Sequence, residues 1–123
     1  MTTRQDVVDF CLAWEDAYAD APFRDDNWTV MRHKSNKKGF AFIYEYQGRM
    51  QVNVKCRPGD TAFWRGAYPD GVLPGYHMNK AHWNTIVLGR VPAGDVKGMI
   101  AESFRLTGKP ERITIRKNGY KEE

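Results

Sequence analysis

The chain has 123 residues, of which 41% are hydrophobic and 13% aromatic, a length and composition that predict a single domain with its own core. No apolar run approaches the roughly 18 residues that a membrane helix needs. The formal charge of +4 is unevenly distributed, because residues 1–26 carry two basic and seven acidic side chains, whereas residues 27–90 carry ten basic and three acidic ones. This asymmetry favours a polarised molecule whose centre attracts anions.

The first predicted element is an amphipathic helix that begins after Thr2 and ends at Ala21-Pro22. Thr2 and Gln5 have the spacing of a capping box. Apolar residues recur at three- and four-residue steps, which is the pattern of a helix with one buried face: Val7, Phe10, Cys11, Trp14, Ala17 and Tyr18. The acidic residues Asp6, Asp9, Asp16 and Asp20 would lie on the opposite face.

Three strands are predicted next, at residues 28–34, 40–46 and 50–56. In the second, Phe40, Phe42, Tyr44 and Tyr46 alternate with smaller or polar residues, and Gln47-Gly48 is short enough for a tight hairpin. The third strand alternates between an apolar and a polar set. We expect its apolar residues to face a core and its polar residues Arg49, Gln51, Asn53 and Lys55 to face water. The three strands predict an antiparallel meander.

The remaining chain predicts a short helix at 61–67, a strand at 84–88, and a last helix that begins at Pro92 and ends at Gly108. Residues 113–115 could form an edge strand. This order predicts an α+β fold, in which one antiparallel sheet has the N- and C-terminal helices packed on one face. We expect a domain at 1–108 followed by a basic tail at 109–123.

The stretch GYHMNKAHW, residues 75–83, contains two of the three histidines. His77 and His82 are five residues apart, which suits neither a shared helix face nor a shared strand face. Cys11 and Cys56 belong to inward-facing positions, where a reactive thiolate is disfavoured, and no Gly-x-Ser-x-Gly motif is present. We therefore expect no metal, no cofactor and no catalytic residues. The N-terminus does not resemble a signal peptide, which favours a cytoplasmic protein with reduced, buried cysteines.

The basic residues favour binding to a polyanion over metal binding or catalysis. Arg32, Lys34, Lys37 and Lys38 surround the first predicted turn and would form one wing able to contact phosphates. Asn79 and Lys80, with His77 and His82 nearby, would form a second wing, and Lys55 and Arg57 could join the same surface. These ten residues are the predicted site for double-stranded DNA. Lysines at a turn also serve solubility, so the pattern alone does not decide.

Pro74 to Lys80, followed by His82-Trp83 and a β-branched strand, resembles the signature of the MmcQ/YjbR family of small bacterial proteins, and the likeness extends from residue 1 to about 107. The resemblance implies a frataxin-like fold with a double-wing surface, from which DNA binding is inferred for the family. The frataxin-like fold also implies an alternative function, iron binding, because frataxins bind iron through acidic residues. The corresponding acidic residues here would be Asp6, Asp9, Asp16, Asp20, Asp25 and Asp26. A second alternative is a structural or protein-interaction module, in which Asn79 and His77 satisfy buried backbone groups and lock the loop.

Overall fold

A computed structural model of the chain describes residues 1–109. Its elements are α1 (Arg4–Cys11), β1 (Ala17–Asp20), β2 (Thr29–His33), β3 (Gly39–Tyr46), β4 (Arg49–Lys55), α2 (Pro58–Ala67), β5 (Val72–Pro74), β6 (Trp83–Val87) and α3 (Ala93–Thr107). The strands form one sheet in the order β1-β2-β3-β4-β6-β5, and every neighbouring pair is antiparallel. The predicted α+β class is confirmed. The predicted edge strand at 113–115 lies outside the described residues.

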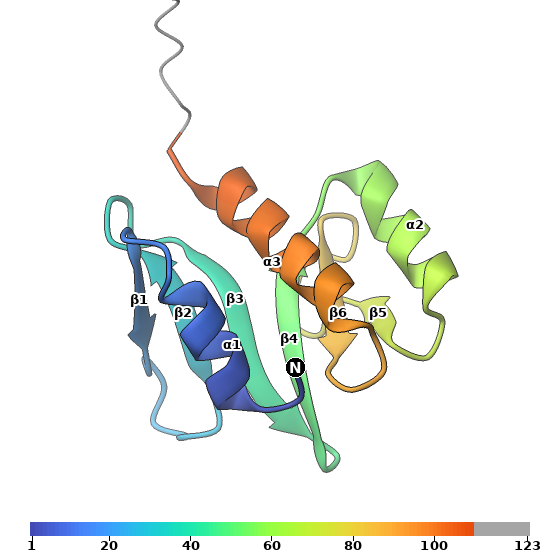
Figure 1. Ribbon diagram of the computed structural model, residues 1–123, viewed down its shortest axis with the longest axis horizontal. Helices are drawn as coiled ribbons and strands as arrows, with labels where there is room; N and C mark the ends of the chain where they lie inside the picture. Colours follow the sequence, from blue (N-terminus) through green and yellow to red (C-terminus); the bar gives the residue numbers. More distant parts are fainter. Residues whose placement is uncertain (110–123) are drawn as a thin grey trace, which may run out of the picture.

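The core lies between the sheet and the helices. Helices α1 and α3 cross the same face of the sheet, as predicted, and α2 packs beside β5 and β6 (Figure 1). Val52 and Val54 of β4 meet Val96 and Ile100 of α3 within one buried apolar cluster. Alternation in β4 and the helical stripe of α3 both bring apolar side chains to this interface. No helix within residues 1–109 is both long and apolar enough to cross a lipid bilayer.

Helix α1 is shorter than the sequence predicted. It ends at Cys11, and Ala17–Asp20 forms β1, which pairs with β2. The sequence predicted a longer helix because Trp14 keeps the helical spacing of the apolar residues. In the structure Trp14 lies in the turn after the helix and stacks on Phe104, with 4.3 Å between ring centroids. Backbone pairing with β2 satisfies the amides of Ala17–Asp20, so tertiary structure overrides the local helical pattern.

The start of α1 and its acidic face also differ from expectation. The capping box is made by Thr3 and Asp6 rather than Thr2 and Gln5: Asp6 N donates to Thr3 Oγ1 at 3.0 Å, and Thr3 N donates to Asp6 Oδ2 at 3.0 Å. Of the acidic residues predicted on one helical face, Asp6 and Asp9 belong to α1, whereas Asp16 precedes β1 and Asp20 ends it. The acidic residues therefore do not form a single helical ridge.

A register shift between β2 and β3 changes the direction of one predicted strand residue. Met31 pairs with Ala41 but Arg32 pairs with Gly39, which leaves Phe40 as an extra residue in β3. The bulge turns Phe40 toward the helices, where its ring lies 4.9 Å from that of Phe104. Phe42 and Tyr44, by contrast, face the opposite side of the sheet.

The polar side of β4 does not face water, contrary to prediction. Gln51 is 6% exposed and Asn53 fully buried, whereas Arg49 is exposed and Lys55 half-buried. The loop of residues 75–82 covers this part of the sheet, since Asn53 Nδ2 donates to Tyr76 O at 2.8 Å. The alternation of β4 was predicted correctly, but the sheet has a covering segment on its second face as well.

Candidate nucleic-acid interface

Three connections leave the sheet at the same end. Ala41 pairs with Val54, Lys55 with Trp83, and Pro74 with Asn84. This pairing places three segments together at one end of the sheet: the β2–β3 turn (residues 34–38), the β4–α2 junction (residues 55–57) and the β5–β6 loop (residues 75–82) (upper end in Figure 1). These segments contain nine of the ten predicted site residues, and Arg32 lies just before them in β2. We refer to this part of the molecule as the basic end.

The β2–β3 turn is anchored to neighbouring elements. Ser35 donates to the Asp16 carboxylate through its amide at 3.0 Å and its hydroxyl at 2.8 Å. The Ser35 hydroxyl is the main reason that the pKa of Asp16 lies below its usual value. Asn36 donates to the carbonyl of Thr107 at 2.9 Å and accepts from Lys38 N at 2.8 Å. These bonds fasten the turn to Asp16, before β1, and to the end of α3.

His33, which sequence reasoning did not select, is buried next to this turn and contacts the same two segments. Its side chain is 2% exposed. Nδ1 lies 3.2 Å from Asp16 Oδ2, and Nε2 lies 2.9 Å from Thr107 Oγ1. The ring thus connects β2 to the end of α3. These partners are 17 and 74 residues away in the chain, so no spacing in the sequence indicates them.

The four cations predicted for the first wing have different environments. Lys34, Lys37 and Lys38 are exposed, and the Lys37 ammonium lies 5.5 Å from the centroid of the Tyr18 ring. Arg32 is half-buried; its Nε donates to Asp20 at 2.8 Å, and its Nη1 donates to the carbonyl of Lys37 at 3.0 Å. Arg32 therefore shapes the turn, while the three lysines present their charge to solvent.

The two cations at the β4–α2 junction also differ. Arg57 is exposed and lies 3.4 Å from Glu102, whose carboxylate also accepts from Arg105. Those two arginines hold the pKa of Glu102 below its usual value, mainly through the Arg105 hydrogen bond. Lys55 is half-buried, and its backbone amide donates to Ser103 Oγ at 2.8 Å. Part of the Arg57 charge is thus already offset within the chain.

Arg65 of α2 holds the end of the β5–β6 loop and the start of β6. Arg65 Nε donates to Asn84 Oδ1 at 2.7 Å, and its Nη2 donates to the carbonyls of Lys80 and Trp83. The ammonium of Lys80 in turn donates to the carbonyl of Gly75 at 3.0 Å. Arg65 was missed by sequence reasoning, because a single arginine on a short helix gives no sign of the loop that it contacts.

Within this loop, His77, Asn79 and Lys80 are exposed and His82 is half-buried. His77 has φ +61°, in the left-handed region that few residues other than glycine adopt. Asn79 Oδ1 accepts from Ala81 N at 2.9 Å, which forms a local turn at the surface. Among the described residues, no three or more His, Cys, Asp and Glu side chains come close enough to hold a metal ion.

A buried polar network lies beneath the loop. Asn53 Oδ1 accepts from Tyr44 Oη at 2.9 Å and from Thr85 Oγ1 at 2.7 Å, and the Asn53 amide donates to Tyr76 O. Tyr76 N completes the network by donating to Thr85 Oγ1 at 2.9 Å. This network locks the loop onto β4 and β6, a role that the sequence suggested for Asn79 and His77 instead.

The two cysteines lie on the helix side of the sheet, Cys11 at the end of α1 and Cys56 in the β4–α2 junction. Both are free and buried, as expected. Burial raises the pKa of Cys11 to about 12 and is the main cause of the rise of the Cys56 pKa to about 11. Neither thiol therefore carries the thiolate that nucleophilic chemistry near neutral pH requires.

A family model described as YjbR matches residues 12–106. The chain belongs to the YjbR family. Among YjbR relatives, the Bacillus subtilis protein YyaQ is 34% identical over 119 residues, covering 87% of this chain and 99% of YyaQ. YjbR of Escherichia coli K12 is 27% identical over 104 residues, covering 84% of this chain and 85% of YjbR.

Two solved structures share the fold of this YjbR-family chain. A Pseudomonas syringae protein superimposes with a TM-score of 0.77 at 28% identity, covering 86% of this chain and 99% of that protein. A Deinococcus radiodurans protein with a DUF419 domain superimposes with a TM-score of 0.81 at 27% identity, covering 97% of this chain and 88% of that protein. The resemblance drawn from the Pro74–Lys80 signature is thereby confirmed at the level of the family.

Proposed function

We propose that this YjbR-family protein binds double-stranded DNA through the basic end of the sheet, without catalysis. The observation that carries the proposal is the position of the β2–β3 turn and the β5–β6 loop at one end of the sheet, the turn with three exposed lysines and the loop with one. The five lysines of these two segments and the junction between them are Lys34, Lys37, Lys38, Lys55 and Lys80. No ion pair within residues 1–109 involves any of them, so none of these charges is offset by a carboxylate there. The Lys80 ammonium also donates to the carbonyl of Gly75.

The spacing of the two connections supports contact with a duplex. The β2–β3 turn and the β5–β6 loop are separated by three strand positions in the sheet. Neighbouring strands lie about 4.8 Å apart, which gives a separation of roughly 14 Å. The major groove of B-DNA is about 12 Å wide, so the two connections suit the phosphates on either side of one groove. In this arrangement each connection would act as one wing.

The charge distribution favours an orientation in which the basic end faces the DNA. The β1–β2 connection, which contains Asp25 and Asp26, leaves the sheet at the opposite end, as its position after Asp20 and before Thr29 requires. A phosphate backbone is therefore attracted toward the lysines and repelled from the acidic connection. Phosphate contacts of this kind position a protein on DNA without reading its sequence.

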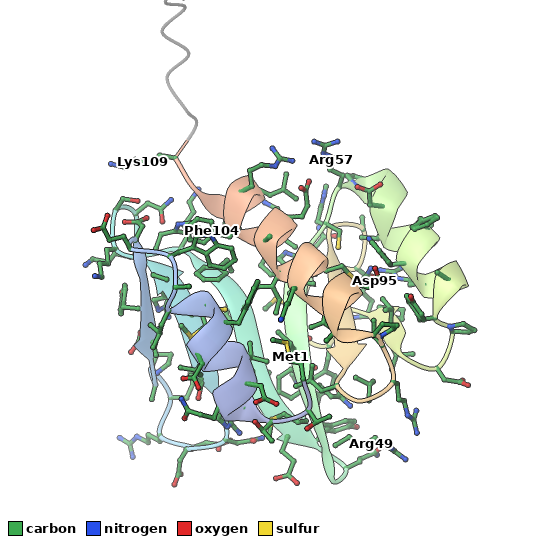
Figure 2. The ribbon with its side chains drawn as sticks, in the orientation of Figure 1. Met1, Arg49, Arg57, Asp95, Phe104 and Lys109 are labelled. Atoms are coloured by element: carbon green, nitrogen blue, oxygen red, sulfur yellow. The ribbon has the colours of Figure 1, made fainter. Side chains whose placement is uncertain are left out.

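The test is fluorescence anisotropy of a labelled duplex of about 25 base pairs with paired charge variants. Lys37→Ala combined with Lys38→Ala should weaken binding to all sequences alike and flatten the log–log salt slope by roughly 1.8, since each phosphate contact contributes about 0.9. The matched control is Arg49→Ala combined with Lys97→Ala, which removes the same charge from two exposed positions. Arg49 lies at the lower end in Figure 2, and the Lys97 ammonium lies 5.7 Å from the centroid of the Phe10 ring of α1. Equal effects of the two pairs would contradict the proposed surface.

The alternative is a structural or protein-interaction module that uses the β5–β6 loop as a rigid surface. The Arg65 and Asn53 contacts favour it, because a loop fastened from both sides presents a fixed shape. Under this alternative the lysine variants would leave partner binding unchanged, while Arg65→Met would impair it. Capture of partners by the wild-type chain and by these variants separates the two functions.

A further inference from the structure

A cavity of about 300 Å³ lies on the face of the sheet opposite the helices, and the β5–β6 loop of the basic end forms one of its walls. Its walls come from three segments that are distant in sequence: the β1–β2 connection, β3 and the β5–β6 loop. The lining residues are Phe23, Asp25, Trp28, Phe42, Tyr76, His77 and Met78. This volume lies at the lower end of the range for small-molecule sites, roughly 300–1,000 Å³.

Aromatic rings form most of the wall. Phe23 meets Trp28 edge to face, with 6.1 Å between centroids and an interplanar angle of 83°. On the other side Tyr76 and His77 lie 4.0 Å apart with their planes tilted by 40°. Four of the seven lining residues are Phe, Trp or Tyr, and rings of this kind attract organic cations that lie over their faces.

The cavity wall has a fixed shape. Asn27 Nδ2 donates to the carbonyl of Glu45 at 2.8 Å, and Asn27 Oδ1 accepts from Glu45 N at 2.7 Å, which fastens the β1–β2 connection to β3. Trp28 stacks on the buried Tyr44 with 4.2 Å between centroids. The opposite wall is held by the bond from Asn53 to Tyr76 O. A ligand would therefore meet rings that are already positioned.

Among residues 1–109, Asp25 is the one carboxylate in the lining, and no lysine or arginine of this part of the chain lines the cavity. One carboxylate oxygen accepts from Asn27 N at 2.6 Å, which fixes its position. The lining is therefore aromatic with a local negative charge, within a chain whose net charge is +4. A primary ammonium carries three hydrogen-bond donors that need acceptors, whereas a quaternary ammonium carries none. The few polar groups in this lining favour the quaternary ion.

We propose that this cavity binds a small quaternary ammonium compound, with the cation against the rings of Phe23, Trp28 and Tyr76 and its charge offset by Asp25. The site does not depend on DNA binding, because its charged group and most of its walls lie outside the basic end. His77 belongs to both surfaces, so an occupied cavity would adjoin the DNA-contacting loop.

The experiment is a titration of the ¹⁵N-labelled protein with choline and, separately, with its neutral analogue 3,3-dimethyl-1-butanol. Binding is monitored by two-dimensional NMR in about 0.3 M NaCl, which screens surface charges. Choline should shift the amides of residues 23–28 and 76–78 and bind at least about threefold more tightly than the neutral analogue. Equal affinity for both compounds, shifts centred on other residues, or no saturable shift with choline would each overturn the proposal.

Variants test the two parts of the site separately. Asp25→Asn keeps an oxygen for Asn27 N and should reduce choline affinity by roughly two- to fivefold while leaving the neutral analogue unaffected. Phe23→Ala should weaken both compounds, and because Phe23 is 52% exposed the fold should persist. Phe63→Ala is the matched control, since Phe63 is 64% exposed on α2 and does not line the cavity. Unchanged choline binding in both Asp25→Asn and Phe23→Ala would overturn the site.

Discussion

Asn53→Ala tests the buried network that holds the β5–β6 loop against the sheet. Asn53 is fully buried and makes three hydrogen bonds, to Tyr44, Thr85 and Tyr76. A buried hydrogen bond contributes about 1 kcal/mol, and an abandoned polar partner adds to the loss. Tyr44 and Thr85 can still contact one another, since their oxygens lie 3.5 Å apart. We therefore expect the free energy of unfolding to fall by about 3 kcal/mol.

The assay is urea and thermal unfolding, with Asn79→Ala as the matched control. For a domain of this size a loss of about 3 kcal/mol corresponds to a decrease in Tm of roughly 10–20 °C. Asn79 is exposed, and within the described residues its side chain bonds only Ala81 N, so Asn79→Ala should cost at most about 1 kcal/mol. If the two variants unfolded at similar temperatures, the lock would not be centred on Asn53.

Three further outcomes follow from buried groups. Cys11 and Cys56 should react slowly with a thiol reagent at pH 8 and rapidly once urea unfolds the chain. The free energy of unfolding should also decline as pH rises from about 9. Above that pH the thiols of the unfolded chain ionise, whereas burial keeps the pKa values in the folded chain at about 12 for Cys11 and about 11 for Cys56. Ser103→Ala should lower stability by about 1–3 kcal/mol in urea unfolding, because Ser103 Oγ joins Lys55 N to Phe40 O. Gly75→Ala should lower Tm, because the new Cβ would lie 2.9 Å from Trp83 O. Fast reaction of the thiols in the folded protein would contradict the first expectation. A Ser103→Ala or Gly75→Ala variant that unfolds like the wild type would contradict the other two.

The sequence predicted those elements whose pattern agrees with their tertiary contacts. Val96, Met99 and Ile100 follow the helical period and are buried in α3. Trp14 and Ala17 continue the period of α1 equally well, yet the chain leaves the helix at Cys11 because β2 offers Ala17–Asp20 a backbone partner. Local spacing contains no information about that partner.

The candidate site shows the same division between local and distant information. The signature around His77 and Lys80 indicated the β5–β6 loop, and the lysines of the first turn indicated the β2–β3 turn, which lies at the same end of the sheet. The pairing of Arg57 with Glu102 could not be read from spacing, because the two residues come from separate elements. Asn53 was assigned to water for a related reason, since the loop that buries it returns more than twenty residues later.

The most direct measurement of the central claim is the salt dependence of duplex binding by the wild-type protein, followed by anisotropy, with heparin and single-stranded DNA as competitors. If the five lysines of the basic end each neutralise one phosphate, the slope of log affinity against log salt should be about −4 to −5, and duplex should compete better than heparin. Absence of saturable binding at low salt, or an affinity independent of salt, would contradict the DNA-binding function.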